Sequence, residues 1–196
     1  MTTSNELSLR DSPAQDAPLV HLGLGSNLGD REANLEAAID GIRSLGLSVT
    51  AASSVYETEP VGLKEQRWYL NQVIECAVPP TLLPRQLLSA VLRIEREMGR
   101  QRTTPSGPRV IDIDLLLWGG LVISGRAAAI EDSRECGLTG AGLTVPHPRM
   151  HLRRFVLEPL CEIAPRVEHP VLKRTCLDLL EHLDDPSAVR VFSTTS

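Results

Sequence analysis

Aromatic residues are scarce in this chain of 196 residues, which contains two Trp, two Tyr and two Phe. Proteins that bind single-stranded nucleic acid commonly stack its bases on aromatic side chains, so the scarcity argues against such a module. Acidic residues also outnumber basic ones, 25 to 20, and the formal net charge is −5. Phosphate backbones select basic surfaces, so the charge argues in the same direction. We therefore predict no nucleic-acid partner.

Long apolar runs are missing as well. No stretch of the sequence approaches the ~18 apolar residues that a membrane-spanning helix needs. Residues 1–18 are polar and lack the basic and then apolar order of a signal peptide. None of the four Cys forms a C-x-x-C pair, so neither a zinc site nor a redox motif is indicated. These absences predict a cytoplasmic protein with reduced thiols and no membrane partner.

The apolar pattern predicts one domain at residues 18–184, after a disordered leader at 1–17 and before a tail at 185–196. The stretch 124–142 is interpreted as a surface insertion. Strands are expected at 19–25, 48–56, 68–78 and 109–119, with 121–124 as the hairpin partner of the last one. Helices are expected at 31–45, 81–98, 156–162 and 175–183. Because strands follow one another directly beside two helices, the order favours an α+β sandwich with a largely antiparallel sheet.

The most informative segment is a strand that carries two aspartates, Asp112 and Asp114, among apolar residues. Side chains alternate along a strand, so both carboxylates share one face, roughly 6–7 Å apart at the backbone. A pair of this kind is often only a solvated polar face. The neighbours Ile111, Ile113 and Leu115 are apolar, however. Carboxylates with this spacing suit Mg²⁺, which takes one or two of them together with phosphate oxygens and water.

An arginine cluster precedes this strand. Arg100, Arg102 and Arg109 lie at or beyond the end of the predicted helix, where guanidinium groups suit phosphates. Carboxylates for Mg²⁺ beside arginines for phosphate predict a site of nucleotide phosphoryl transfer. The sequence has no G-x-x-x-x-G-K-[ST] loop, and Gly23 and Gly25 lack the third glycine of a dinucleotide motif. We expect these two glycines to serve a tight turn.

Six segments follow one another in a fixed order: Leu-Gly-Ser-Asn-Leu-Gly-Asp (24–30), Ser-Ser-Val-Tyr-Glu-Thr-Glu-Pro-Val-Gly (53–62), Tyr-Leu-Asn-Gln-Val (69–73), Ile-Glu-Arg-Glu-Met-Gly-Arg (94–100), Gly-Pro-Arg-Val-Ile-Asp-Ile-Asp-Leu-Leu (107–116) and Leu-Thr-Val-Pro-His-Pro-Arg-Met (143–150). Together they resemble the 6-hydroxymethyl-7,8-dihydropterin pyrophosphokinase family, over roughly residues 19–165. The resemblance implies a ferredoxin-like α+β sandwich, in agreement with the predicted order. It also implies a step of folate biosynthesis, in which ATP donates pyrophosphate to the pterin hydroxymethyl oxygen and AMP is released.

Roles for the charged residues follow from this resemblance. It implies that Asp112 and Asp114 hold two Mg²⁺ ions, and that Arg100, Arg102 and Arg109 are catalytic, with Arg102 on a mobile loop. The residues implied at ATP are Glu95, Arg100, Arg102, Arg109, Thr144, His147 and Arg153. A histidine between two prolines is by itself more often structural, and the motif reverses that interpretation for His147.

The pterin side is implied in the same way. Tyr69 and Phe155 match a stacking pair, and Asn71 matches an amide that recognises the ring edge. By themselves the two aromatic residues would more often belong to the core, whereas Asn is unusual inside a strand. The residues implied at the pterin are Thr58, Val61, Gly62, Tyr69, Asn71 and Phe155.

Three positions depart from the family pattern. Pro105 and Ser106 stand where many relatives have an arginine and an aromatic residue, so closure over the substrates is expected to differ. The arginine expected just before Leu143 is missing, and Arg126 or Arg134 is the candidate replacement. Leu92 stands where some relatives have a glutamine near the nucleotide.

Three alternatives are distinguishable by experiment. A non-catalytic relative would bind ligands without releasing AMP, although the intact aspartates and arginines argue against it. A nucleic-acid module would shift a labelled oligonucleotide in a gel. Another Mg²⁺-dependent nucleotide transferase would differ in its acceptor. We expect a monomer whose partners are small molecules, ATP and 6-hydroxymethyl-7,8-dihydropterin.

Overall fold

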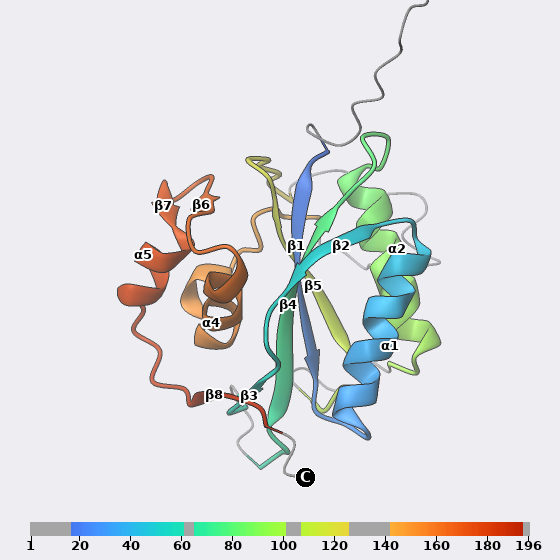
Figure 1. Ribbon diagram of the computed structural model, residues 1–196, viewed down its shortest axis with the longest axis vertical. Helices are drawn as coiled ribbons and strands as arrows, with labels where there is room; N and C mark the ends of the chain where they lie inside the picture. Colours follow the sequence, from blue (N-terminus) through green and yellow to red (C-terminus); the bar gives the residue numbers. More distant parts are fainter. Residues whose placement is uncertain (1–16, 61–64, 101–106, 126–141, 194–196) are drawn as a thin grey trace, which may run out of the picture.

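The computed structural model describes residues 17–60, 65–100, 107–125 and 142–193. In this part of the chain, one six-stranded sheet has the order β5–β1–β4–β3–β8, with β2 also paired to β4 (Figure 1). Its strands are β1 Leu19–Ser26, β2 Ser48–Ala52, β3 Tyr56–Thr58, β4 Tyr69–Ala77, β5 Asp112–Trp118 and β8 Val189–Val191. All pairings between these strands are antiparallel. The predicted α+β sandwich with a largely antiparallel sheet is confirmed.

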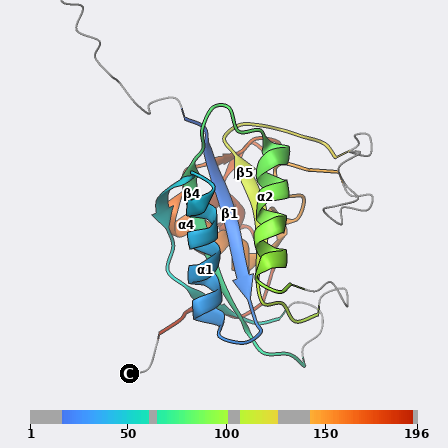
Figure 2. The same ribbon diagram turned by 90° about the vertical axis from the view of Figure 1, so that its right-hand side faces the viewer.

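Helices α1 (Arg31–Ser44) and α2 (Pro84–Glu97) lie side by side over one face of the sheet (Figure 2). Helix α1 begins where the Asp30 carboxylate accepts a hydrogen bond of 3.2 Å from the backbone N–H of Ala33, as an N-cap does. The apolar stripes of both helices pack against alternate residues of the strands and form the larger core. Its fully buried members include Val20, Leu22, Leu35, Ile42, Leu87 and Val91.

The other face of the sheet is only partly covered (Figure 1). The covering elements are the 3₁₀ helix η1 (Met150–Leu152), α4 (Arg154–Ile163), the short hairpin of β6 (Glu168–His169) and β7 (Arg174–Thr175), and α5 (Cys176–Glu181). They form a second core with the strands, built on Val73, Leu116, Leu117, Met150, Val156 and Leu160. The same face continues beyond this core, where the strands carry polar residues and glycine.

The strand expected at 48–56 is in fact two strands with a break between them. Ser53 is buried at the break, and its hydroxyl accepts a hydrogen bond of 3.0 Å from the backbone N–H of Val73. The same hydroxyl donates to the carbonyl of Ser54 at 2.8 Å. The Ser53 hydroxyl therefore accepts the hydrogen bond that a backbone carbonyl of a continuous strand would otherwise accept from Val73. Strand β3 then extends to Thr58, two residues beyond the predicted end at residue 56.

Helix α2 begins at Pro84, three residues later than Thr81, the predicted start. The ring of a proline disfavours helical backbone in the preceding residue, and proline itself suits the first turn. Leu83 accordingly has extended backbone, with φ −88° and ψ 148°. The carbonyl of the Gln86 side chain accepts a hydrogen bond of 2.9 Å from the N–H of Leu83.

The predicted hairpin between 109–119 and 121–124 is wrong. The chain does turn at Gly119, which has φ +47°, but Ile123 then pairs with Val145 in an isolated bridge. The outer edge of β5 is occupied instead by His147, whose backbone N–H donates to the carbonyl of Leu116 at 2.9 Å. This contact places the predicted nucleotide histidine against the strand that carries the aspartates.

The main sheet includes residues beyond the domain boundary predicted at residue 184. Strand β8 pairs with β3, with Tyr56, Glu57 and Thr58 opposite residues 191, 190 and 189. Residues assigned to a tail without a role therefore extend the main sheet. The predicted leader at 1–17, except for its last residue, and nearly all of the insertion at 124–142 lie outside the described residues.

Candidate active site

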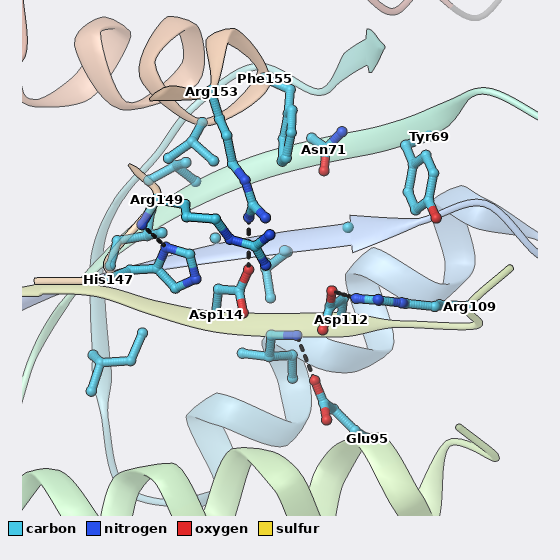
Figure 3. A pocket seen from close by; sticks show the side chains of 18 of the residues that line it. Tyr69, Asn71, Glu95, Arg109, Asp112, Asp114, His147, Arg149, Arg153 and Phe155 are labelled. Atoms are coloured by element: carbon cyan, nitrogen blue, oxygen red, sulfur yellow. Dashed lines mark hydrogen bonds and ion pairs between the residues drawn. The ribbon is translucent and has the colours of Figure 1, made fainter. Parts of the chain in front are cut away.

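A cavity of about 590 Å³ opens on the partly covered face of the sheet (Figure 3). Its floor is formed by β1, β4 and β5, one side by α2 and Arg100, and the other by the segment from residue 142 to α4. Charged side chains gather around β5, and the aromatic rings lie over β4 (Figure 3). The cavity therefore has two chemically different ends.

Two glycines keep the floor of the cavity open. Gly25 lies between Asn71 and Asp112 in the strand register, and Gly23 lies between Val73 and Asp114. A Cβ atom on Gly25 would come within 2.8 Å of the Asn71 Oδ1 atom. The expectation that these glycines serve a tight turn is wrong, because both lie inside β1 and make room for what enters the cavity.

Gly25→Ala is therefore expected to affect the aromatic end of the cavity without destabilising the sheet. The new methyl group would displace the Asn71 side chain, and we expect about 10²-fold weaker binding of the ligand that Asn71 contacts. Gly120→Ala is the matched control, because a Cβ there meets nothing within 4 Å. Isothermal calorimetry and thermal melting measure the two effects. Equal affinities in both variants would contradict the assigned role of Gly25.

Asp112 and Asp114 project from the same face of β5, as predicted. Asp112 forms ion pairs with Arg100, at 2.8 Å between Oδ1 and Nη1, and with Arg109 through Oδ2. Asp114 has a more distant partner, the Nη1 atom of Arg153 at 3.9 Å. Burial raises the pKa of Asp114 to about 6, and the nearby Asp112 carboxylate adds to the shift. The positive charges of Arg153, Arg109 and Arg100 oppose this shift but do not outweigh it.

Glu95 contacts both β5 and Arg100. It comes from α2 and is almost fully buried, and its Oε1 atom accepts a hydrogen bond of 2.7 Å from the backbone N–H of Ile113. The same atom pairs with the Arg100 guanidinium. Burial raises the pKa of Glu95 to about 7, against the opposing effect of Arg100. The side chain therefore ties α2 and Arg100 to β5.

A basic wall faces the aspartates. His147, Arg149 and Arg153 all line the cavity on the segment that leads into α4. Burial lowers the pKa of His147 to about 4, and the positive charges of Arg153 and Arg149 lower it further. The backbone N–H of Arg149 donates to the Nδ1 atom of His147 at 3.2 Å. A neutral imidazole beside two guanidinium groups (Figure 3) is suited to an anionic ligand.

The other end of the cavity combines two rings with an amide. Asn71 lies between the rings of Phe155 and Tyr69 in the view of Figure 3. Its Nδ2 atom donates a hydrogen bond of 2.6 Å to the hydroxyl oxygen of Thr58, and both residues are buried. The Arg153 guanidinium lies 5.4 Å from the centre of the Phe155 ring. Such a site suits a flat ligand whose edge carries donors and acceptors.

Comparison with known proteins decides between the chemistries that this cavity allows. The model of the 7,8-dihydro-6-hydroxymethylpterin-pyrophosphokinase (HPPK) family matches residues 21–165. The chain belongs to this family. A 2-amino-4-hydroxy-6-hydroxymethyldihydropteridine pyrophosphokinase from Bacillus subtilis is 40% identical over 151 residues, which are 76% of this chain and 80% of that protein.

Longer proteins contain a similar unit. The folic acid synthesis protein fol1 of Pneumocystis carinii is 34% identical over 170 residues, which are 87% of this chain and 21% of that protein. The wild-type HPPK-DHPS structure of Plasmodium falciparum with pterin and p-hydroxybenzoate matches with a TM-score of 0.67 at 17% identity, over 87% of this chain and 44% of that one. At that identity the match shows the fold alone. The predicted ferredoxin-like sandwich is confirmed.

The segments that resemble the HPPK family converge on this one cavity. Every predicted site residue that the structure describes lines the cavity: Thr58, Tyr69, Asn71, Glu95, Arg100, Arg109, Asp112, Asp114, Thr144, His147, Arg153 and Phe155. Val61, Gly62 and Arg102 lie outside the described residues, as do Arg126, Arg134 and the altered positions Pro105 and Ser106.

Arg149 lines the cavity but was not among the predicted site residues. It lies inside one of the segments quoted for the HPPK family, two residues after His147, and was given no role there. Its charge was the available signal, because a second arginine four residues later was already assigned to the nucleotide. Leu92, noted as a departure from the family pattern, also lines the cavity.

Proposed function

We propose that this cavity is where the chain, a pyrophosphokinase of folate biosynthesis by its family, transfers pyrophosphate from ATP to 6-hydroxymethyl-7,8-dihydropterin. One observation carries the proposal. A single cavity joins an acidic pair surrounded by arginines to an amide flanked by two aromatic rings. The first end has the chemistry of a triphosphate site, and the second has that of a pterin site.

The donor set fits magnesium, which HPPK enzymes generally use with ATP as co-substrate. In the described part of the chain, no three His, Cys, Asp or Glu residues form a complete metal cage. The chain offers the two carboxylates Asp112 and Asp114, and Mg²⁺ characteristically completes its shell with phosphate oxygens and water. We propose that these carboxylates would hold two ions, whose charge would neutralise the triphosphate and lower the pKa of the attacking hydroxyl.

The basic residues would hold the nucleotide. Arg100 and Arg109 lie on either side of Asp112, where they meet the transferred phosphates. His147 and Arg153 face them across the cavity, and Thr144 lines the same wall. Neutral His147 can donate a hydrogen bond without adding charge. Their common effect is to stabilise the charge that moves onto AMP as it leaves.

The pterin would lie at the aromatic end. We infer that Tyr69 and Phe155 contact its two faces and that Asn71, oriented by Thr58, pairs with its edge. This orientation would direct the hydroxymethyl group across β1, over Gly25, toward the aspartates on β5. The hydroxyl oxygen would then bond to the β-phosphorus while the bond from that phosphorus to the AMP oxygen breaks. AMP would leave with the electron pair of that bond, and the hydroxyl proton would pass to water.

The partners proposed for this chain are small molecules. No helix in the described ranges has the length and apolar character to cross a membrane. A monomeric state and a cytoplasmic location stay predictions.

The test is AMP release from ATP and Mg²⁺ in the presence and absence of 6-hydroxymethyl-7,8-dihydropterin, with Asp114→Ala as the inactive comparison. We expect the unmodified chain to release AMP only when the pterin is present. We expect Asp114→Ala to release none. Binding of both substrates by calorimetry without AMP would identify a non-catalytic relative. Absence of both binding and AMP would refute the proposal.

A further inference from the structure

A cluster of five side chains lies behind the aromatic end of the cavity, on the α1 face of the sheet. It contains Arg31, Glu57, Trp68, Arg190 and Phe192, and we call it the rear cluster. Two of its members come from the C-terminal strand region, beyond the residues 21–165 that the family model matches. The proposed chemistry makes no use of this cluster.

Glu57 is the centre of the rear cluster. Its Oε2 atom accepts hydrogen bonds from Nη2 and Nε of Arg190, at 2.6 and 3.2 Å. Its Oε1 atom accepts a hydrogen bond of 3.0 Å from Nη1 of Arg31 at the start of α1. The hydrogen bonds from Arg190 are the largest cause that lowers the pKa of Glu57. One carboxylate thus connects β3 to both α1 and β8.

Trp68 is held by the same two arginines. The Nη1 atom of Arg31 donates to the Trp68 carbonyl at 2.8 Å, and the Arg190 guanidinium lies 5.0 Å from the centre of the Trp68 ring. Phe192 in turn lies 5.7 Å from the Arg31 guanidinium. Guanidinium groups over aromatic faces add attraction to the ion pair, and their planar shape makes it directional.

The residues held from behind are the sequence neighbours of the pterin residues. Glu57 precedes Thr58 on β3, and Trp68 precedes Tyr69 at the start of β4. Adjacent residues of a strand point to opposite faces, so fixing one side chain on the α1 face fixes the next one on the cavity face. Thr58 then sets the orientation of Asn71 through their hydrogen bond of 2.6 Å.

Strand β3 needs this support because it is only three residues long. Strand β4 pairs with it on one side and β8 on the other. Backbone hydrogen bonds extend the second pairing at both ends, from Phe192 N to Val55 O at 2.8 Å and from Glu59 N to Ala188 O at 3.0 Å. Without β8, β3 would become a short edge strand, and such strands open readily.

We propose that β8, acting through Arg190, is a positioning element of the pterin site. Arg190 holds Glu57 and Trp68 from behind, and thereby fixes Thr58, Asn71 and Tyr69 at the aromatic end of the cavity. The identity of the ligand in this proposal rests on the proposed function. The positioning itself is a property of the chain and can be measured without substrate.

The first test compares Arg190→Ala with the unmodified chain in steady-state kinetics. We expect the KM for the pterin to rise about fivefold, with the KM for ATP and kcat within about twofold. Arg190→Lys keeps the charge opposite Glu57 but loses the planar group over Trp68, so it should fall between the two. Arg43→Ala, an exposed arginine that pairs with Asp40 on α1, is the matched control. Equal rises of both KM values, or no change in either, would overturn the proposal.

The second test is hydrogen exchange of the same variants without any ligand. Arg190→Ala is expected to exchange faster in peptides that cover 55–60 and 68–72, and at an unchanged rate over α2. Faster exchange throughout the chain would mean a general loss of stability. Unchanged exchange would mean that Arg190 does not restrain these segments. Either result would contradict the proposed positioning role. If the unmodified chain produces no AMP, the proposed function fails while this measurement still decides the role of β8.

Discussion

Asp114→Asn is expected to lower kcat by on the order of 10³-fold while leaving the chain folded. The amide keeps the shape of the carboxylate but removes the charge that attracts a divalent cation. Among the described residues, the ion pair of Asp114 is a distant one, at 3.9 Å from Arg153, so its loss should cost little stability. Its pKa is raised to about 6 by burial and by Asp112, which means that the folded state disfavours the charge. Removing that charge should therefore not lower the free energy of unfolding at pH 8.

The sign of this last expectation follows from linkage. A carboxyl group whose pKa is higher in the folded than in the unfolded state destabilises the fold at pH values above the folded pKa. At pH 8 Asp114 is in this range. The thermal midpoint of Asp114→Asn should accordingly equal or exceed that of the unmodified chain.

The measurements are AMP release over a range of Mg²⁺ concentrations and thermal melting at pH 8. Asp40→Asn is the matched control, because Asp40 is exposed on α1 and pairs only with Arg43 among the interactions of the described residues. Turnover of Asp114→Asn within a few fold of the control would refute the assignment of Asp114 as a metal ligand. A large drop in the thermal midpoint would show instead that the carboxylate supports the fold.

Local sequence patterns were sufficient to predict a feature that lies within a single strand or helix. The alternation in β5 predicts that Asp112 and Asp114 share a face, and the structure places both in the cavity. The aromatic residues were ambiguous by themselves, because a ring that stacks on a ligand and one that packs in a core share the same local pattern. The order of six motifs favoured a role in stacking for Tyr69 and Phe155, and both residues line the cavity.

Local sequence patterns failed to predict strand pairing where the partner of a segment is distant in the sequence. The short apolar run at 121–124 resembles the return strand of a hairpin, but the edge of β5 beside Leu116 is occupied by the backbone of His147. Strand β8 was missed for the same reason. It has three residues, too few for a periodic signal, and it is ordered by β3, more than 130 residues earlier in the chain.

The role of Gly23 and Gly25 was missed for a different reason. Glycine is common in turns, so a pair of glycines near the end of a strand predicts one. Their role becomes visible only across the strands, where Gly25 lies between Asn71 and Asp112 and the Asn71 side chain leaves no space for a Cβ atom. A glycine in a sequence does not indicate what occupies the space where a side chain would otherwise lie.

Asn71→Ala is expected to weaken pterin binding roughly 10²-fold while the KM for ATP changes little. The side chain is buried, its Nδ2 atom donates to Thr58 at 2.6 Å, and its Oδ1 atom lies over Gly25 at the floor of the cavity. Truncation removes the hydrogen bonds to the ligand edge and leaves the Thr58 hydroxyl without this partner. The arginines proposed to bind phosphate should be unaffected, because they lie around β5.

Asn71→Asp separates recognition from packing. The carboxylate has the same shape and can accept a hydrogen bond from the Thr58 hydroxyl, but it replaces the amide N–H donors by an acceptor. Both variants should therefore lose pterin affinity, measured by calorimetry, and retain nucleotide affinity. Thr50→Ala serves as the control, since Thr50 is an exposed residue of β2 that bonds to Glu75 at the far edge of the sheet. Unchanged pterin affinity in Asn71→Asp would mean that Asn71 supports the cavity without recognising the ligand, and the pterin would then be selected by the two rings alone.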